Sequence, residues 1–221
     1  KSLRGELPDG TSGIGHTRWA THGRPTDFNA HPHTDCQGEV VVVHNGIVEN
    51  FLELRRELEK QGHLFSSQTD SECIAHLIES LLRQEYSLED AVRETSGRIH
   101  GAHAVIVVSK REPGKLVGFR LGHAGGIVVG YGDGEMFLAS DLPALLPHTR
   151  RVAYLAGNEA LSVTQSGARF SLLDGTPIEK PVSFAPYDAI SAVKGEYKHF
   201  MLKEINEQPE AIISTMRGLA S

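Results

Sequence analysis

Arg18 and Trp19 form the first group in the sequence that could bind a charged ligand. They lie in the stretch His-Thr-Arg-Trp-Ala-Thr-His-Gly at residues 16–23, which contains the only tryptophan of the chain. A guanidinium group beside an indole ring is typical of a stacked, bidentate binder of carboxylates. The alternative is an arginine that lies over an aromatic ring at the surface.

Asn45 and Gly46, which follow His44, could stabilise negative charge that develops on an oxygen atom. A side-chain amide next to a glycine N–H group supplies two donors of the kind that form oxyanion holes. The same dipeptide is also the strongest short signal for a two-residue type I′ hairpin turn. The local sequence alone favours the turn.

Asp70 stands in the stretch Thr69-Asp70-Ser71-Glu72, just before an apolar helical pattern. An aspartate at such a position usually caps the helix that follows it. The functional alternative is a carboxylate that binds an ammonium group at the rim of a pocket.

A possible metal pattern lies at His31, His33 and Cys36. A His-x-His pair with a nearby cysteine can bind zinc. No second ligand pair with finger-like spacing accompanies it, so we expect no metal site, and structural histidines under a loop. Asp35 beside Cys36 disfavours a thiolate, and Cys73 is expected to be a small buried hydrophobic residue.

Short apolar patterns predict the elements that must position these side chains. A β-branched run at residues 39–44 predicts a buried strand that leads into Asn45. Apolar periodicity predicts three helices that begin near Asn50, Thr69 and Ser87, the first two with capping-box spacing.

The second half of the chain reads mainly as strands. Strand-like runs occur at residues 104–108, 116–119, 127–129, 136–139, 151–155, 161–164 and 170–173. Pro113-Gly114 and Asp133-Gly134 predict hairpin turns between them. A last helical pattern covers residues 201–216 and contains Pro209. Helices in one block and strands in hairpins predict the α+β class.

Composition excludes several classes of function. The chain has 221 residues, a net charge of −6 and two cysteines. This acidic balance argues against a nucleic-acid partner, which requires a basic face. No apolar run approaches the roughly 20 residues of a membrane span, and the opening residues do not form a signal peptide. Two cysteines cannot form a disulfide framework, so a cytoplasmic location fits best, and we expect neither a cofactor nor a membrane partner.

In this order, the motifs resemble the glutaminase domain of the class II glutamine amidotransferases. The matching stretches are residues 16–23, 29–33, 44–50, 69–72, 137–141 and 203–209, so the resemblance covers nearly the whole chain. The pairing of Arg-Trp-Ala-Thr-His-Gly with His-Asn-Gly is typical of this class. The Lys-Glu-Ile-x-Glu-Gln-Pro stretch at residues 203–209 favours the glutamine–fructose-6-phosphate aminotransferase branch.

The resemblance implies a role for each polar residue singled out above. Arg18 would bind the α-carboxylate of glutamine, and Asp70 would bind its α-ammonium group. Asn45 and the backbone N–H of Gly46 would form the oxyanion hole.

The remaining residues of the first motif would shape the glutamine pocket. Thr21 and His22 would line it, largely through the main chain, and Trp19 would belong to its wall or to a mobile gate. The implied fold is the four-layer αββα sandwich of N-terminal-nucleophile hydrolases, which agrees with the α+β pattern.

The resemblance also implies how the domains of a longer chain are organised. Residues 1–194 would form the glutaminase domain, and residues 195–221 would link it to a sugar-phosphate isomerase half outside this sequence. Glutamine would be hydrolysed to glutamate and ammonia, and the ammonia would convert fructose 6-phosphate to glucosamine 6-phosphate. The full enzyme is expected to be a homodimer.

This sequence departs from the family pattern at its start. It begins Lys1-Ser2, whereas the mature family chain begins with the nucleophilic cysteine. We therefore expect the chain by itself to be inactive. A smaller departure lies at residues 120–126, where family members usually carry a Gly-Ser-Pro run. Two alternatives stay open: the glutaminase domain of another class II amidotransferase, and an inactive glutamine-binding or regulatory module.

Overall fold

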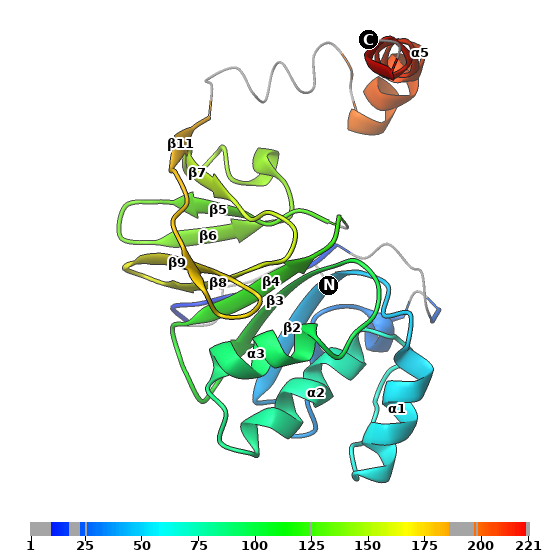
Figure 1. Cartoon of the computed structure of the whole chain (residues 1–221), viewed down its shortest axis with the longest axis vertical. Coiled ribbons are helices and arrows are strands. Elements are labelled where there is room, and N and C mark those ends of the chain that lie inside the picture. Colours follow the sequence, from blue (N-terminus) through cyan, green and yellow to red (C-terminus); the bar gives the residue numbers. More distant parts are fainter. Residues whose placement is uncertain are drawn as a thin grey trace.

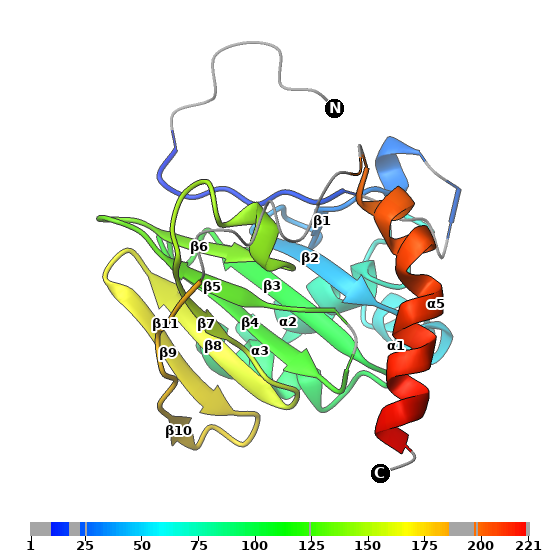
Figure 2. The same cartoon turned by 90° about the horizontal axis from the view of Figure 1, so that it is seen from above.

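The computed structural model describes residues 10–17, 23–24, 26–123, 125–185, 197 and 199–219. Two antiparallel sheets lie face to face, and a block of helices covers the outer face of the larger sheet (Figure 1). Seen from above, the strands of the smaller sheet lie in front, and the helices α2 (Glu72–Leu82) and α3 (Leu88–Ser96) lie behind both sheets (Figure 2). The α+β class predicted from the sequence is confirmed.

The larger sheet has seven strands in the order β1-β2-β3-β4-β8-β9-β10, and every neighbouring pair is antiparallel. Its strands are β1 (His33–Thr34), β2 (Val40–Gly46), β3 (His103–Ser109), β4 (Leu116–Leu121), β8 (Glu159–Thr164), β9 (Gly167–Leu172) and β10 (Pro177–Ile178). β2 is an interior strand next to the edge strand β1, and it pairs with β1 on one side and β3 on the other.

The smaller sheet has four strands in the order β11-β7-β5-β6. They are β11 (Ser183–Phe184), β7 (Arg151–Tyr154), β5 (Val128–Tyr131) and β6 (Met136–Ala139). The predicted hairpin turns are confirmed, since Gly114 joins β3 to β4 and Gly134 joins β5 to β6, both with positive φ. The short helix η2 (Leu142–Ala144) follows β6, and Leu145 just beyond it is buried against Val128 and Val152.

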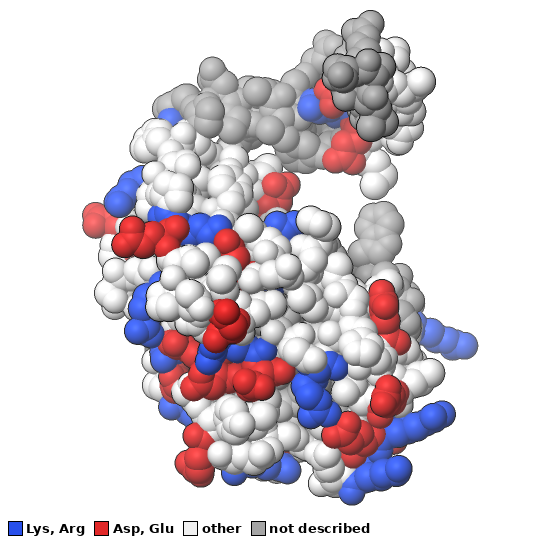
Figure 3. Space-filling view, viewed as in Figure 1, with Lys and Arg blue, Asp and Glu red and all other residues white. Residues whose placement is uncertain are grey.

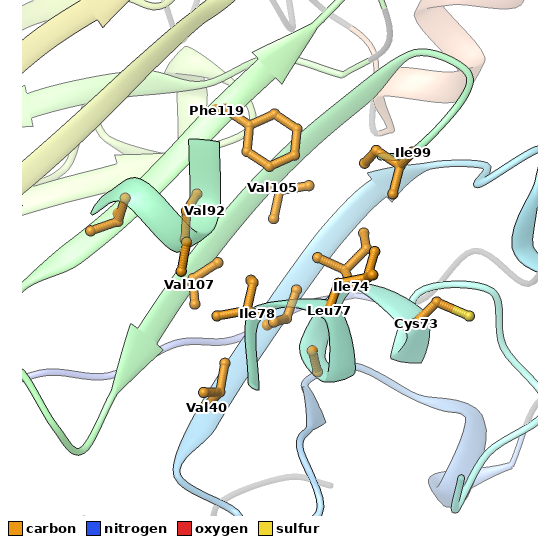
Figure 4. Packing of buried hydrophobic residues seen from close by; sticks show 14 of the residues in the cluster. Val40, Cys73, Ile74, Leu77, Ile78, Val92, Ile99, Val105, Val107 and Phe119 are labelled. Carbon is orange, nitrogen blue, oxygen red and sulfur yellow. The ribbon is translucent and has the colours of Figure 1, made fainter. Parts of the chain in front are cut away.

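The main core lies between the larger sheet and its helices α1 (Phe51–Lys60), α2 and α3. Figure 4 shows side chains of both layers pointing toward one another, among them Val105, Val107, Ile74, Leu77 and Ile78. Each of these side chains is at most 1% exposed. Truncation of one of them to alanine would cost roughly 2–5 kcal/mol, because it removes buried apolar area and leaves a cavity.

Neither of the two capping boxes expected from the sequence, at Asn50 and at Thr69, is formed, whereas the third helix has a cap that was not predicted. The Ser87 side chain accepts a hydrogen bond from Asp90 N at the start of α3. Asn50 and Ser71 precede α1 and α2 without a side-chain cap. The Asn50 side chain instead bonds Arg98 O and His100 N, so it joins two loops rather than capping α1.

The expected αββα sandwich is represented in the described residues by one helical layer and two sheets. The helix α5 (Phe200–Leu219) contains Pro209, as predicted, and stands apart from the sheets (Figure 1). Its apolar side chains Met201, Ile205 and Met216 are all more than half exposed. Across the described part of the chain, no helix is long and apolar enough to cross a membrane.

Charged side chains are mixed over the surface. On the face shown in Figure 3, acidic and basic residues alternate over the helices and strands. Part of this mixture consists of ion pairs, such as Lys115 and Arg169 with Glu89.

Candidate functional site

The candidate site lies at the end of β2, where the strand continues through Asn45 and Gly46. Asn45 pairs with Ala104 of β3, and Gly46 pairs with His103. A two-residue hairpin turn is therefore ruled out, because these residues belong to the strand ladder itself. The turn was favoured by local sequence alone, and the long-range pairing with β3 overrides it.

The Asn45 side chain is oriented by His16. The Asn45 Oδ1 atom lies 2.8 Å from His16 Nε2. An amide oxygen only accepts hydrogen bonds, so His16 Nε2 carries the hydrogen, and the Asn45 N–H groups are directed elsewhere. Both residues line a cavity of about 810 Å³ between residues 11–17 and the two sheets. The arrangement can present amide donors to a ligand in this cavity.

Gly46 has a conformation and a packing that exclude any side chain. Its φ is +142°, and a Cβ atom there would lie 2.4 Å from Ala102 O. The same atom would lie 2.8 Å from His44 Nε2 and 2.9 Å from His103 Nδ1. Glycine is thus required for the backbone to pass over these imidazoles.

Asp70 is hydrogen-bonded to the chain just beyond the same end of β2. Its Oδ2 atom accepts a hydrogen bond of 2.7 Å from the backbone N–H of Val48, two residues after Gly46. The carboxylate is 3% exposed, so it contributes its charge from beneath the surface. The structure therefore brings together the three predicted site residues that it describes, Asn45, Gly46 and Asp70.

A chain of hydrogen bonds connects the elements beneath Gly46. Ser71 Oγ lies 2.8 Å from His44 Nδ1, and His44 Nε2 lies 3.0 Å from His103 Nδ1. His103 Nε2 is 3.1 Å from the carbonyl oxygen of His100. The carbonyl only accepts, so neutral His103 accepts from His44 Nε2–H, and His44 Nδ1 accepts from the Ser71 hydroxyl.

The surroundings keep these histidines neutral. Burial lowers the pKa of His44 well below its ordinary value, and the positive charge that His103, His31, His16 and His33 would carry lowers it further. Burial also lowers the pKa of His103, although its bond to His100 O acts in the opposite direction. When both imidazoles are neutral, each group donates to the next, from the Ser71 hydroxyl through His44 and His103 to the His100 carbonyl. These hydrogen bonds join β2, β3 and the start of α2.

Sequence reasoning did not identify this histidine network. His44 was noted only as part of a motif, and His103 was not singled out. The contact joins residues 59 positions apart, so only the register of β2 against β3 reveals it.

The remaining predicted site residues, Arg18, Trp19, Thr21 and His22, lie outside the described residues. The described residues on either side of them are anchored near the site. His16 bonds Asn45, and the Arg24 carbonyl accepts a bond of 3.0 Å from Asn29 Nδ2. Asn29 Oδ1 in turn accepts from the backbone N–H of Gln68, two residues before Asp70.

Neither cysteine lies beside Asn45 along β2. Cys36 precedes the first residue of β2, and Asn45 is near its other end, so β2 separates them by roughly 17 Å at about 3.3 Å per residue. Cys73 is fully buried in the main core, as expected, and its thiol lies 3.7 Å from Phe51 O. Burial raises the pKa of Cys73 to about 12, so it is not a reactive thiolate.

Comparison with known proteins defines the class of this chain. Residues 16–147 match the glutamine amidotransferase domain family, which covers more than half of the chain. The chain belongs to this family. The match begins at His16 and includes Asn45, Gly46 and Asp70.

Two curated relatives of this chain from different organisms have the same name. The chain is 49% identical over 221 residues to a glutamine–fructose-6-phosphate aminotransferase (isomerizing) from Aquifex aeolicus, covering 100% of this chain and 37% of the relative. It is 50% identical over 211 residues to the enzyme of that name from Methanothermobacter thermautotrophicus, covering 96% of this chain and 35% of the relative. The chain thus spans about a third of the length of these relatives.

Solved structures share the fold at low sequence identity. A glutamine phosphoribosylpyrophosphate amidotransferase from B. subtilis superposes with a TM-score of 0.58 at 22% identity, covering 72% of this chain and 34% of that one. An allosteric regulatory enzyme of purine biosynthesis gives a TM-score of 0.59 at 23% identity over the same shares. These similarities confirm the amidotransferase type of fold expected from the sequence.

Proposed function

We propose that this chain supplies the glutamine-binding and oxyanion-stabilising residues of the glutaminase domain of a glutamine–fructose-6-phosphate aminotransferase, which hydrolyses glutamine to glutamate and ammonia. The ammonia would convert fructose 6-phosphate to glucosamine 6-phosphate on an isomerase half outside these 221 residues. The names of relatives that are about half identical over nearly the whole chain support this acceptor. The likeness to the phosphoribosylpyrophosphate enzyme supports only the fold.

The observation that carries the proposal is the link between Asn45, Gly46 and Asp70. Hydrolysis of an amide needs donors for the oxyanion of its tetrahedral intermediate. It also needs a clamp on the amino-acid end that presents the amide to the nucleophile. The hydrogen bond from Val48 N–H to Asp70 holds the carboxylate close to the predicted oxyanion donors. One part of the clamp and the oxyanion hole are therefore adjacent.

In this proposal, each site residue has a defined task. The Asn45 side chain and the Gly46 N–H bind the oxyanion, and the Asp70 carboxylate attracts the α-ammonium group. Arg18 binds the α-carboxylate through its two parallel N–H donors. The anchoring of His16 to Asn45 and of Asn29 to Gln68 supports a position of the intervening Arg18 motif at this site.

Trp19, Thr21 and His22 complete the pocket in this proposal. Thr21 and His22 line it, largely through the main chain, and Trp19 forms its wall or gate. Their place in the matched family region supports these roles.

The nucleophile in this proposal is a cysteine outside these 221 residues. Cys36 lies toward the opposite end of β2 from Asn45, and Cys73 is buried in the helical core. We therefore infer that the 221-residue chain binds glutamine but does not turn it over.

The wider setting follows from the same relatives. We propose that residues 1–194 form the glutaminase domain, that residues 195–221 link it to the isomerase half, and that the full enzyme is a cytoplasmic homodimer. The separation of α5 from the sheets supports a linking role for the C-terminal segment (Figure 1). Free thiols at Cys36 and Cys73 are compatible with a reducing compartment.

Calorimetry with L-glutamine and L-glutamate tests the clamp. Arg18→Lys keeps the charge but loses the planar fork, so affinity should fall by about 10–100-fold, as expected for a charged hydrogen bond worth roughly 1.5–3 kcal/mol. Asp70→Asn should weaken binding similarly, while its remaining amide oxygen can still accept from Val48 N–H. Arg24→Lys is the matched control and should bind like the wild type. Equal affinity of wild type and Arg18→Lys would contradict the clamp.

A further inference from the structure

A second cluster of reactive side chains lies at the end of β2 that is opposite to Asn45. It consists of Cys36, His63, His76 and Glu79, whose ligand atoms all lie within 4.8 Å of one another. Cys36 lies in the turn before β2, His63 follows α1, and the last two residues stand on α2. The cluster therefore joins three separate segments of the chain.

We propose that Cys36, His63, His76 and Glu79 bind one zinc ion in a closed, four-ligand site. This differs from the zinc pattern considered from the sequence, which grouped Cys36 with His31 and His33. His33 Nε2 lies instead 3.0 Å from Thr69 Oγ1 and is not one of the four clustered residues.

Three separations between the donor atoms are close to those around a tetrahedral zinc ion. Zinc bonds of about 2.0–2.3 Å hold neighbouring N, O and S ligands roughly 3.3–3.6 Å apart. Cys36 Sγ lies 3.7 Å from His63 Nδ1 and 3.6 Å from His76 Nδ1. Glu79 Oε2 lies 3.2 Å from His76 Nδ1 and 2.8 Å from His63 Nδ1. The separation between His63 Nδ1 and Glu79 Oε2 must lengthen to admit the ion.

Hydrogen bonds alone do not satisfy all the polar atoms of this cluster. The Nδ1 atoms of His63 and His76 each face both the Cys36 sulfur and the same Glu79 oxygen. A neutral imidazole nitrogen carries at most one hydrogen, so it cannot donate to both neighbours at once. One zinc ion would accept electron pairs from all four atoms, and the thiol would release its proton on binding.

The outer nitrogens of both imidazoles face polar groups. His63 Nε2 lies 2.7 Å from Ser80 Oγ, a hydrogen bond, whereas His76 Nε2 lies 3.7 Å from Glu72 Oε1, which is close to the carboxylate but beyond hydrogen-bond distance. Metal-binding histidines commonly direct their second nitrogen to a hydroxyl or carboxylate that fixes the ring. Both rings direct Nδ1 toward Cys36 and Glu79, as a shared zinc ion requires.

The charges and remaining contacts also fit a zinc ion. A Cys36 thiolate and the Glu79 carboxylate together neutralise a divalent cation. The other Glu79 oxygen, Oε1, pairs with Arg83, which leaves Oε2 as a single ligand atom. The backbone N–H of Leu64 lies 3.4 Å from the sulfur and supports a thiolate. The soft sulfur with nitrogen donors favours zinc over magnesium or calcium.

Zinc binding is tested on a Cys73→Ala protein, in which Cys36 is the only cysteine. Cobalt alone should produce a thiolate-to-metal absorption band and the visible bands of a tetrahedral site, and zinc should displace it at one ion per chain. Cys36→Ser should abolish the thiolate band and weaken zinc binding by more than the roughly 10–100-fold that loss of a supporting partner costs. Far-ultraviolet circular dichroism verifies that both variants are folded.

Two further readouts do not depend on the Cys36 variant. Zinc at about 1,000 times its Kd should raise the melting temperature of the Cys73→Ala protein by roughly 8–16 °C, because only the folded chain assembles the site. Zinc should also protect Cys36 from alkylation. Absence of the cobalt–thiolate band, or melting and alkylation that do not respond to zinc, would overturn the proposal. Both readouts are independent of glutamine turnover.

Discussion

Asn45 is linked to the N-terminal segment by its hydrogen bond with His16. Its Oδ1 atom is held by His16, while its backbone pairs with Ala104 of β3. In a version extended at the N-terminus to a leading cysteine, Asn45→Ala should lower kcat by about 10²–10³-fold with KM nearly unchanged, because the donor acts mainly in the transition state. Glutamate release at varied glutamine concentrations measures both parameters.

Thermal melting separates this role from a structural one. The strand pairing of Asn45 uses its main chain, so Asn45→Ala should melt close to the wild type. His148→Ala, a change at an exposed histidine outside the site, is the control for activity. Normal turnover by Asn45→Ala would exclude the oxyanion role, and a loss of stability alone would favour a purely structural one.

Gly46→Ala should destabilise the protein much more than alanine at another glycine with positive φ. The new Cβ would lie 2.4 Å from Ala102 O and collide with His44 and His103, in a conformation that L-residues rarely adopt. Gly38 is the matched control, since its φ is +64° and nothing lies within 4 Å of the added atom. We expect Gly38→Ala to cost about 1–2 kcal/mol and Gly46→Ala clearly more, measured by urea unfolding. Equal losses of unfolding free energy in the two variants would show that the surroundings of Gly46 can rearrange to accommodate a side chain.

At the scale of elements, the Ser71–His44–His103 chain joins β2, β3 and α2 and makes their association sensitive to pH. The pKa of His44 is well below its ordinary value in the folded protein, whereas an unfolded histidine titrates near 6.5. Below about pH 6.5, the unfolded state therefore binds more protons than the folded state, and stability falls as the pH falls. The slope for one such histidine reaches about 1.4 kcal/mol per pH unit.

Urea unfolding between pH 8 and pH 5 tests this expectation. The wild type should lose stability steadily below about pH 6.5, and His44→Gln should show a shallower loss because one titrating group is removed. His148→Gln, at an exposed position, should keep the wild-type slope. Parallel curves for wild type and His44→Gln would contradict a neutral, buried His44.

The helix starts show how far local sequence determines these elements. The Ser87 cap was predictable because the partner, Asp90 N, is three residues away. The Thr69-x-x-Glu72 spacing suggested a similar box, yet Glu72 accepts bonds from the backbone N–H groups of Ser66 and Ser67. Local spacing located the helices, but partners in the preceding loop decided which hydrogen bonds form.

The candidate sites show the same limit more strongly. Asn45, Gly46 and Asp70 were predicted as site residues from the family resemblance, whereas their residue types alone favoured a turn and a helix cap. Neither the His44–His103 contact nor the Cys36–His76 contact has a local signal, since the partners are 59 and 40 positions apart. The pairing of β2 with β3 and the packing of α2 bring these side chains together, and neither arrangement is encoded in a short stretch.

At the scale of the whole molecule, the two proposed sites lie at the two ends of β2. Asn45 and Gly46 mark the end that faces the cavity, and Cys36 precedes the end that contacts α2. This arrangement places the Cys36 thiol far from the predicted oxyanion donors. It also separates the proposed structural zinc site from the proposed glutamine site.

The same arrangement predicts that neither Cys36 nor Cys73 attacks glutamine. In the version extended to a leading cysteine, the double variant Cys36→Ser/Cys73→Ala should retain glutamate release, because both thiols lie away from Asn45 and Cys73 is buried with its pKa raised to about 12. The 221-residue chain should release no glutamate, since its described site residues can bind and polarise the amide but cannot attack it. Replacement of the leading cysteine by alanine is the control that should abolish release. Release by the 221-residue chain that disappears in Cys36→Ser or Cys73→Ala would instead place the nucleophile within this sequence.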